Sequence, residues 1–401
     1  MAALKSMTID PYNNVLVDLG ALRDNFLAVR RRVSPAARLM AVVKADAYGH
    51  GLVPAAGAFA WAGADCFGVA EVEEGVRLRE AGIAGEIVVL LGVASAGAAE
   101  AVARELSPVV FERMMLDQLS RQAVIQGKVV GVHLKIDLGM GRLGLEPAAA
   151  GEMAVAINTL PGLRLAGILS HFPLADDPEA AELCREQWGR FQRTAAGLLG
   201  DGPAGERPLL HMANSAALLR FPETHADMVR PGISLYGYAP ADSDLDSAGQ
   251  TLALRPAMSL RSRVLQVKEL AAGRGVSYGH RFVTTRATRL AVLPLGYAHG
   301  YPRGLSGRAE VLIAGRRVPL RGTICMNACM ADITELPEVA VGDEVVFMGR
   351  QGEEFIGADE LAARHGTISY EILCRFGAAN RHLFIGDEVV QKRDLFDQRQ
   401  A

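Results

Sequence analysis

Short apolar runs alternate with longer amphipathic segments along roughly the first 250 residues of the chain. The amphipathic segments are rich in Ala, Glu and Arg and place apolar residues at helical spacing, as in EVEEGVRLREAG and REQWGRFQRTAAGLL. The apolar runs have the length and content of buried strands. The predicted strands are 39–45, 66–70, 86–92, 107–111, 131–139, 166–172, 208–215 and 227–237.

This alternation predicts a parallel sheet with helices on both faces, because strands that are buried on both sides are apolar along their whole length. Eight strand–helix units in about 220 residues suit a (β/α)8 barrel, which is the predicted α/β fold of this part of the chain. A doubly wound sheet is the alternative. It would carry a Gly-rich dinucleotide-binding turn after its first strand, and KADAYGHG is not such a turn.

The pattern changes after about residue 250, where apolar and polar residues tend to alternate and glycines interrupt the runs. Segments such as RLAVLPLGY, RAEVLIAGRRVPLRG and EVAVGDEVVFMG predict a mainly antiparallel β domain, interrupted by one helix around GADELAARHG. The predicted division is a barrel domain over 10–245, a linker over 241–250 and a β domain over 250–395. The first few residues are an optional addition to the β domain.

Composition and charge exclude several functions. A formal net charge of −3 offers no basic surface for nucleic acid or an anionic membrane. The five cysteines are few and scattered, which argues against disulfides and for a reducing cytoplasm, and Cys325 and Cys329 lack the further ligands of a zinc site. The N-terminus is no signal peptide, and Gly and Pro54 break the longest uncharged stretch, 47–64. We expect a cytoplasmic protein with no metal and no membrane span.

Polar side chains stand at the carboxyl ends of several predicted strands, which is where barrel enzymes carry their functional residues. The last two predicted strands end in ANSA and RPGIS, and such small residues are typical of a phosphate site after strands seven and eight. The strand-end residues are Lys44, Lys135 with Asp137, His171, Asn214 with Ser215, and Arg230 with Gly232.

Lys44 gives the sharpest single signal. A lysine that closes a buried strand is desolvated, so its pKa should fall and its amine could form a Schiff base with an aldehyde cofactor. The alternative is a lysine that extends from the strand end into solvent.

Nine motifs occur in an order that resembles one family. They are AVVKADAYGHG, HLKIDLGMGRLG, SHF, HMANSAA, RPGISLYG, VSYGHRF, LPLGYAHGYPR, GTICMNACM and ISYEILC. Together they span about residues 15–385 and resemble the bacterial alanine racemases. The resemblance implies a pyridoxal 5'-phosphate enzyme with an N-terminal barrel and a C-terminal β domain. It also implies a homodimer with shared active sites that interconverts L- and D-alanine for peptidoglycan synthesis.

The resemblance gives the two catalytic bases. Lys44 would hold the cofactor as an internal aldimine and act as one base, and Tyr278 from the partner subunit would be the other. Racemisation needs proton removal on one face of a planar carbanion and proton return on the other, which two bases on opposite faces can provide. Taken alone, a tyrosine in a Gly-flanked β turn, such as Tyr278, is usually a packing or edge aromatic.

The resemblance also gives the cofactor-binding residues. Arg230 would face the pyridine nitrogen, and because an arginine stays protonated, the ring would be a weaker electron sink. His171 would pack near the ring and orient Arg230. A salt-bridged arginine and a core histidine are the alternatives. The residues expected to cradle the phosphate are Tyr48, Ser215, Gly232, Ile233 and Tyr370.

Arg142 would bind the substrate carboxylate through its planar fork, with help from the backbone N–H of Met326. Lys135 corresponds to a lysine that is carbamylated in many members of the family, and the carbamate would give Arg142 an anionic neighbour. The alternative is an ordinary solvated lysine.

Departures from the family pattern fall near the expected site. Leu138 replaces a threonine, and His299 and Asn327 replace common aspartates. Tyr297, His299 and Asn327 are expected to line the substrate entrance, and the two replacements of aspartate are expected to make it less acidic. The tail also differs, because AANRHLF stands where the family has an arginine-valine-proline-arginine run.

Other activities fit parts of the sequence. A serine or broader-specificity racemase of the same family would be expected to replace Tyr370 by a smaller polar residue. A non-catalytic pyridoxal phosphate carrier would lack the β domain and the Tyr278 motif. A basic-amino-acid decarboxylase would place an acidic group where Arg230 stands.

Overall fold

The computed structural model describes residues 12–64, 66–198, 207–240 and 252–386. Two compact units divide the chain: one is formed by residues 19–255, and the other joins the chain up to Asp18 to residues 256–386. The predicted linker over 241–250 lies outside the described residues. No helix in the described ranges is long and apolar enough to cross a membrane.

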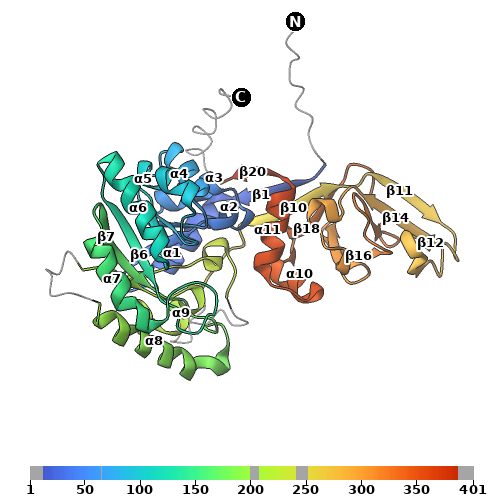
Figure 1. Ribbon diagram of the computed structural model, residues 1–401. Helices are drawn as coiled ribbons and strands as arrows, with labels where there is room; N and C mark the ends of the chain where they lie inside the picture. The colour runs from blue at the N-terminus through green and yellow to red at the C-terminus, as the bar shows by residue number, and fades with distance from the viewer. Residues whose placement is uncertain (1–11, 65, 199–206, 241–251, 387–401) are drawn as a thin grey trace, which may run out of the picture. The chain divides into compact units, whose positions relative to one another are not determined.

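The first unit is a parallel barrel (Figure 1). Its strand order, β8-β7-β6-β5-β4-β3-β2-β9, follows the chain except that the last strand returns to the first. The N–H of Arg230 donates to the carbonyl of Ala213 at 2.9 Å, which brings the segment after β9 against the segment after β8 and nearly closes the barrel. The strands are β2 (Arg38–Val42), β3 (Cys66–Val69), β4 (Glu86–Val89), β5 (Ser107–Val110), β6 (Val130–Lys135), β7 (Leu163–Leu169), β8 (Leu209–His211) and β9 (Met228–Val229).

The barrel prediction is confirmed, and the doubly wound alternative is wrong. Each of the eight predicted strands overlaps an observed one, because these segments are apolar along their length and are buried between the barrel interior and the outer helices. The helices that accompany the strands are α1 (Leu19–Arg30), α3 (Leu52–Trp61), α4 (Val72–Glu80), α5 (Ala98–Ala103), α6 (Arg113–Gln126), α7 (Ala150–Thr159), α8 (Ala181–Ala196) and α9 (Ser215–Arg220).

Helix α8 illustrates how the outer helices pack. It buries Cys184, Trp188, Phe191 and Ala195, which recur at the spacing of one helical face, while charged residues occupy the opposite face. The helices thus cover the outside of the barrel and leave its two ends as the places where polar groups can be reached.

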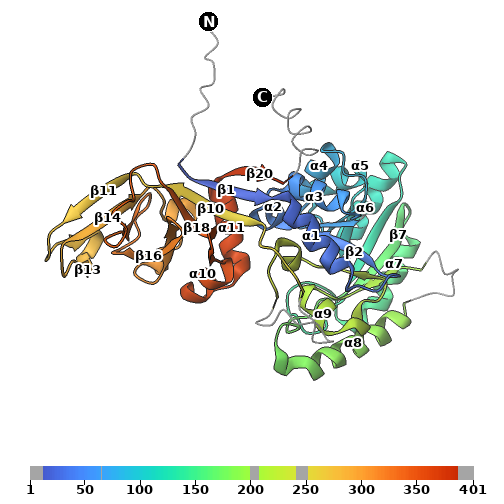
Figure 2. The same cartoon turned by 180° about the vertical axis from the view of Figure 1, so that it is seen from behind.

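The second unit is a mainly antiparallel sheet with the order β11-β14-β17-β16-β15-β18-β10-β1-β20, and this confirms the predicted β domain. The N-terminal strand β1 (Asn14–Asp18) pairs antiparallel with β10 and parallel with β20 (Figure 2). The remaining strands are β10 (Met258–Arg263), β11 (Gln266–Leu270), β12 (Gly275–Val276), β13 (Phe282–Val283), β14 (Thr288–Leu293), β15 (Glu310–Ile313), β16 (Arg316–Arg321), β17 (Cys329–Asp332), β18 (Glu344–Gln351), β19 (Glu354–Ile356) and β20 (Arg381–Ile385).

Two α-helices lie in the described part of this unit. Helix α10 (Ala358–His365) is the one predicted around GADELAARHG, and α11 (Ser369–Ala379) follows it. Strand β10 alternates buried and less buried residues, as expected for a sheet with one covered face.

Candidate active site

The carboxyl end of the barrel brings together the site residues predicted within residues 19–255. Lys135 is the last residue of β6, and Arg230 directly follows β9. The positive charges of Arg230, Arg142 and Lys44 all act on Lys135 and on His171, so these five side chains share one electrostatic environment. The other predicted site residues of the barrel are Tyr48, Ser215, Gly232 and Ile233.

Lys44 stands at the start of an unusual turn. Strand β2 ends at Val42, so Lys44 is not on the strand as predicted but begins α2 (Lys44–Gly49). The next four residues, Ala45 to Tyr48, are left-handed, with φ of 52 to 55° and ψ of 35 to 53°. None is a glycine, and this conformation costs about 1–2 kcal/mol per residue. Strain of this kind persists where the surrounding structure enforces it, and it is common at functional sites.

Hydrogen bonds from α4 and from the turn itself hold this conformation. The Glu74 carboxylate accepts from the N–H of Asp46 at 3.2 Å and from the N–H of Ala70 at 2.7 Å. The Asp46 carboxylate accepts from the N–H of Leu52 at 2.9 Å, at the start of α3. The turn that carries Lys44 and Tyr48 is therefore fixed to two helices.

Tyr48, Ser215 and Gly232 meet closely. The Gly232 N–H donates to the Ser215 hydroxyl at 2.8 Å, and a Cβ on Gly232 would lie 2.2 Å from the Tyr48 hydroxyl. Tyr48 stacks on Tyr236 with ring centroids 4.7 Å apart. Because Gly232 has already given its N–H to Ser215, the Ser215 hydroxyl hydrogen is left to donate elsewhere.

The same segment carries a buried hydroxyl. Ile233 opens the short helix η5 (Ile233–Tyr236) directly after Gly232. The next residue, Ser234, is fully buried, and its hydroxyl has no hydrogen-bond partner among the described residues. A buried polar group without a partner is costly, so its presence beside Gly232 is consistent with a group that binds there.

Arg230 is buried, with 6% of its surface exposed. Its Nη1 donates to Nδ1 of His211 at 2.9 Å, and its Nη2 donates to the carbonyl of Ser170 at 2.6 Å. Burial lowers the pKa of Arg230 to about 10, which still leaves a cation at neutral pH. Arg230 is therefore a fixed positive charge in the barrel, and its N–H groups are held in place by acceptors on His211 and Ser170.

The histidine that binds Arg230 most closely was missed in the sequence. The predicted partner, His171, lies within reach, with its Nδ1 3.3 Å from Nη2 of Arg230. His211 is nearer, at 2.9 Å, and is fully buried at the end of β8. The motif HMANSAA contains His211, and the need of a buried arginine for acceptors could have drawn attention to it.

Lys135 is buried among cations. Burial, and then the charges of Arg230, Arg142 and Lys44, lower the pKa of Lys135 to about 8, and only Asp137 opposes them. The solvated-lysine alternative is wrong, because only 6% of Lys135 is exposed.

Asp137 organises the loop that leads to Arg142. Its carboxylate accepts from the N–H groups of Gly139, Met140 and Arg142 at 2.9, 2.8 and 3.2 Å. Burial would raise the pKa of Asp137, but these backbone hydrogen bonds lower it. Leu138 is buried, and its carbonyl accepts from Gln187 at 3.1 Å. The backbone is thus fixed up to Arg142, whose side chain is exposed.

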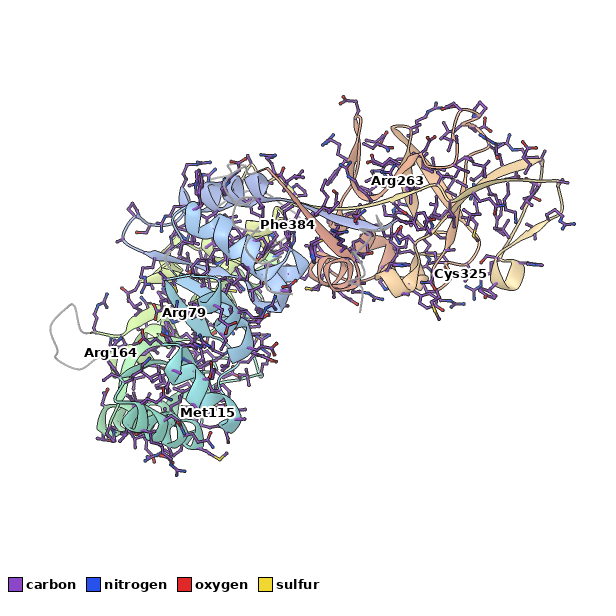
Figure 3. All side chains as sticks on the ribbon, turned by 90° about the horizontal axis from the view of Figure 1, so that it is seen from above. Arg79, Met115, Arg164, Arg263, Cys325 and Phe384 are labelled. Carbon is purple, nitrogen blue, oxygen red and sulfur yellow. The ribbon has the colours of Figure 1, made fainter. Side chains whose placement is uncertain are left out.

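The β unit brings together its own group of predicted residues. Three loops that carry Tyr278, Tyr297 and Met326 are hydrogen-bonded to one another. Thr323 donates its hydroxyl to the carbonyl of Tyr278 at 2.8 Å, and the N–H of Tyr297 donates to the carbonyl of Cys325 at 3.1 Å (Figure 3 labels Cys325). Tyr278 is 73% exposed and Met326 55% exposed within this chain.

The remaining predicted residues flank these loops. His299 lies in the same turn as Tyr297, and the carbonyl of His299 accepts from Asn380 at 3.0 Å, at the end of α11. Asn327 follows Met326 and is exposed. Tyr370 stands in the first turn of α11 and so belongs to the β unit, whereas Tyr48, Ser215 and Gly232 belong to the barrel.

One end of the barrel holds Lys44, the buried Arg230 and a cradle formed by Tyr48, Ser215 and Gly232, and an antiparallel β domain follows in the chain. This combination is typical of a class of cofactor-dependent barrel enzymes. The chain belongs to the alanine racemase family, whose cofactor is pyridoxal 5'-phosphate. Residues 17–240 match the family model described as alanine racemase, N-terminal domain, and residues 257–384 match the alanine racemase, C-terminal domain.

Individual relatives agree over most of their length. The chain is 47% identical over 360 residues to the alanine racemase of Symbiobacterium thermophilum, covering 89% of this chain and 93% of that one. It is 44% identical to that of Nitratidesulfovibrio vulgaris, covering 91% and 97%. The crystal structure of alanine racemase from Streptomyces lavendulae superposes with a TM-score of 0.87 at 37% identity, covering 95% of this chain and 99% of that one. The resemblance noted from the motifs is thereby confirmed.

Proposed function

We propose that this protein is an alanine racemase, an isomerase that interconverts L- and D-alanine with pyridoxal 5'-phosphate. Family membership supports the reaction, and relatives from several bacteria carry the same activity in their names. The observation that carries the proposal is local to the barrel. One end of it combines Lys44, the cradle around Gly232 and the buried cation Arg230.

The residues around Gly232 fit a phosphate group. The hydroxyls of Tyr48 and Ser215 and the backbone N–H of Ile233 are donors without charge, and Ser234 adds a buried hydroxyl without a partner in the described structure. A side chain at Gly232 would collide with the Tyr48 hydroxyl and displace it. We infer that Tyr48, Ser215, Ile233 and Ser234 hold the cofactor phosphate, and the role of Tyr370 stays a prediction from the family resemblance.

When bound, pyridoxal phosphate supplies an electron sink for the negative charge that develops at the substrate α-carbon. The chain's own residues move the protons. Lys44 Nζ accepts or returns the α-proton on one face of the substrate, and Tyr278 Oη does so on the other. With the cofactor bound, Arg230 would be the residue that faces the pyridine nitrogen, and because it keeps its own protons, it would leave that nitrogen without one.

We infer a homodimer, and the exposure of Tyr278 supports this inference. This tyrosine is 73% exposed within its own chain, although it lies on a loop held by the Thr323 hydroxyl. A catalytic base is expected to be enclosed when it acts. We therefore propose that Tyr278 and Met326 complete the site of a partner subunit, with Tyr297, His299 and Asn327 at its entrance.

Substrate binding is proposed to depend on Arg142, which pairs with the substrate carboxylate, and on the backbone N–H of Met326.

Lys135, with its pKa lowered to about 8, is partly a neutral amine near neutral pH. Its nitrogen can attack the carbon of carbon dioxide and lose a proton, which gives a carbamate anion. That anion would offset the charges of Arg142 and Arg230 nearby.

The entrance is expected to be less acidic than usual for the family. Burial lowers the pKa of His299 below its ordinary value, so this residue is neutral at neutral pH and replaces an anion. Retention of Tyr370 favours alanine over serine as the substrate. A cytoplasmic location and a role in supplying D-alanine for peptidoglycan complete the proposal.

The direct test is the reaction of the purified protein with pyridoxal phosphate and L-alanine. We expect D-alanine to form and a visible absorbance band to appear on cofactor binding, and Lys44→Ala to lose both. Parallel assays with L-serine and with basic amino acids separate the alternatives. Faster turnover of serine would favour the broader racemase, release of carbon dioxide the decarboxylase, and a band without turnover the carrier.

A further inference from the structure

A line of polar side chains runs through the barrel interior from Arg230 toward the opposite end. Nη1 of Arg230 lies 2.9 Å from Nδ1 of His211, and Nε2 of His211 lies 3.0 Å from Nδ1 of His133. Nε2 of His133 lies 3.2 Å from Oε1 of Glu86, whose Oε2 accepts from Arg38 at 2.9 Å. Glu86 and Arg38 are the first residues of β4 and β2, so the line ends at the amino ends of the strands.

The two ends of this line require the same direction for every hydrogen bond in it. An arginine only donates, so Nδ1 of His211 must accept and the proton of this neutral ring is on Nε2. That N–H donates to Nδ1 of His133, whose own proton is then also on Nε2 and donates to Glu86. The line is therefore a one-way chain of donors that starts at a cation and ends at a carboxylate.

The barrel is shaped to hold the middle of this line. His133 pairs in register with Gly167 of β7, and a Cβ on Gly167 would lie 2.2 Å from Nδ1 of His133. The register of β6 and β7 shifts between Val132 and His133, and such irregularities re-aim side chains. Both His133 and His211 are fully buried. Imidazoles are costly to bury, so a site that makes room for them and pairs both nitrogens is not incidental packing.

We propose that Glu86 and His133 are positioning residues for Arg230, acting through His211. At the far end of the line, the Glu86 carboxylate offers only acceptors to His133. By accepting, it sets the tautomer of both rings so that His211 presents a lone pair, and not an N–H, to the guanidinium. This holds the Arg230 guanidinium in its position between His211 and the Ser170 carbonyl. The effect on racemisation rests on the proposed function, whereas the positions of the protons on the His133 and His211 rings do not depend on it.

The charge states of Glu86 and His211 agree with this direction of the hydrogen bonds. Burial would raise the pKa of Glu86, but the hydrogen bond and charge of His133, with Arg38, lower it to about 2. Burial, and then Arg230, lower the pKa of His211 well below its usual value. At neutral pH, Glu86 is thus an anion that can only accept, and His211 is neutral.

The deciding substitution is Glu86→Gln. Glutamine keeps the shape of the side chain, but its amide can donate as well as accept, so it no longer holds His133 and His211 in one tautomer. An N–H of His211 turned toward Arg230 would break the hydrogen bond from Nη1 of Arg230. The matched control is Glu80→Gln, because Glu80 is a barrel carboxylate that pairs with Arg104 at 3.1 Å and contacts no histidine that the structure describes.

The tautomers can be read from ¹⁵N-labelled imidazoles by NMR in the full chain, with and without pyridoxal phosphate. We expect His133 and His211 to be neutral with the proton on Nε2 in the wild type and in Glu80→Gln, and to become mixed in Glu86→Gln. Gly167→Ala, which intrudes on His133, should disturb the same two signals. A ring of the wild type that is protonated on Nδ1, or tautomers unchanged by Glu86→Gln, would overturn the proposal.

Activity gives the second measurement. Residues that orient another group typically contribute tenfold or more, so Glu86→Gln should lower kcat by about tenfold with KM within about twofold, while circular dichroism stays unchanged. Unaltered kcat in Glu86→Gln would also overturn the proposal. If the wild type makes no D-alanine, the proposed function fails, and the imidazole signals alone decide whether the line positions Arg230.

Discussion

The Tyr48 hydroxyl occupies the space that a side chain on Gly232 would need, 2.2 Å from the position of its Cβ. The two residues come from opposite ends of the barrel sequence, one from the left-handed turn after β2 and the other from the loop after β9. Their contact closes the cradle in which we place the cofactor phosphate.

Gly232→Ala should therefore weaken cofactor binding. The added methyl group must displace Tyr48 or the backbone, and we expect the Kd for pyridoxal phosphate to rise by about tenfold or more, since the loss of one good hydrogen bond to a charged group costs about 1.5–3 kcal/mol. Spectroscopic titration of the cofactor-free protein measures this. Gly57→Ala is the control, because a Cβ there meets nothing within 4 Å in helix α3. Equal affinity in both variants would argue against the cradle.

The left-handed turn should depend on Glu74. Glu74→Gln replaces one of two carboxylate acceptors by an amide N–H, which then faces the backbone N–H of Asp46 or Ala70. We expect the free energy of unfolding to fall by about 1–3 kcal/mol. Urea unfolding measures the loss, and Glu73→Gln, at an exposed neighbouring position, should leave stability nearly unchanged. Similar stability in the two variants would mean that the turn is held by other contacts.

Lys135 should make stability depend on pH. Its pKa is about 8 in the folded protein and 10.5 ordinarily, so the unfolded chain binds the proton more tightly. Stability therefore rises with pH between about 8 and 10.5, and below pH 8 the charged Lys135 costs at most about 3 kcal/mol. Lys135→Met should be more stable than the wild type at pH 7, with a difference that shrinks toward pH 10.5.

Urea unfolding in buffers free of carbon dioxide tests this dependence. Lys128→Met is the control, since Lys128 is a surface lysine that pairs with Glu105 at 3.1 Å. Added bicarbonate should stabilise the wild type at pH 8 and leave Lys135→Met unaffected, because only the wild type can form the carbamate. A bicarbonate effect of equal size in both proteins would exclude Lys135 as its site.

Shared active sites can be tested by mixing inactive chains. Lys44→Ala and Tyr278→Phe should each abolish racemisation, and a hybrid dimer of the two contains one site with both wild-type residues. We expect activity to return on mixing, up to about one quarter of the wild-type value if the subunits exchange at random. Exchange without recovery, followed by native mass spectrometry, would place Lys44 and Tyr278 of one chain in one site.

Much of the fold was predictable because apolar patterning determines it. The eight barrel strands are apolar along their length, which indicates a parallel sheet covered on both faces, and the β domain alternates, which indicates a sheet with one covered face. The left-handed turn at residues 45–48 could not be predicted, since no glycine marks it and tertiary hydrogen bonds to Glu74 and Asp46 impose it. As a result, Lys44 was assigned to a strand that ends two residues earlier.

The interior polar line was also beyond sequence reasoning. His133, His211 and Glu86 each lie within an apolar strand, where a single polar residue gives no indication of which way it points. Only the closure of the barrel brings residues 78 positions apart, such as His133 and His211, into hydrogen-bonding distance. Functional residues of a barrel stand at the carboxyl ends of its strands, and this rule found Lys135, His171, Ser215 and Arg230. It needs only the position where each strand ends, which the sequence indicates, and not which strands pair.

Arg230 gives the last prediction. Its guanidinium donates to the carbonyls of Ser170 and Met212 as well as to His211, so the pocket consists of acceptors that require a donor. Arg230→Glu would place a carboxylate against these acceptors. The variant should lose about 3–5 kcal/mol of stability, which is the usual cost when a buried charge loses its partner. Where it folds with cofactor, its carboxylate would let the pyridine nitrogen hold a proton, so we expect a new long-wavelength absorbance band with alanine, slower racemisation and more transamination.

Arg230→Lys keeps the positive charge but has one ammonium in place of the planar fork, so it cannot serve His211 and both carbonyls with the same geometry. It should fold better than Arg230→Glu, lack the long-wavelength band and racemise more slowly than the wild type. Absorbance spectra, D-alanine formation and pyruvate release from alanine measure these outcomes in the two variants. If Arg230→Glu folded and retained the spectra and racemisation rate of the wild type, Arg230 could not contact the cofactor ring, and its assignment at the pyridine nitrogen would have to be abandoned.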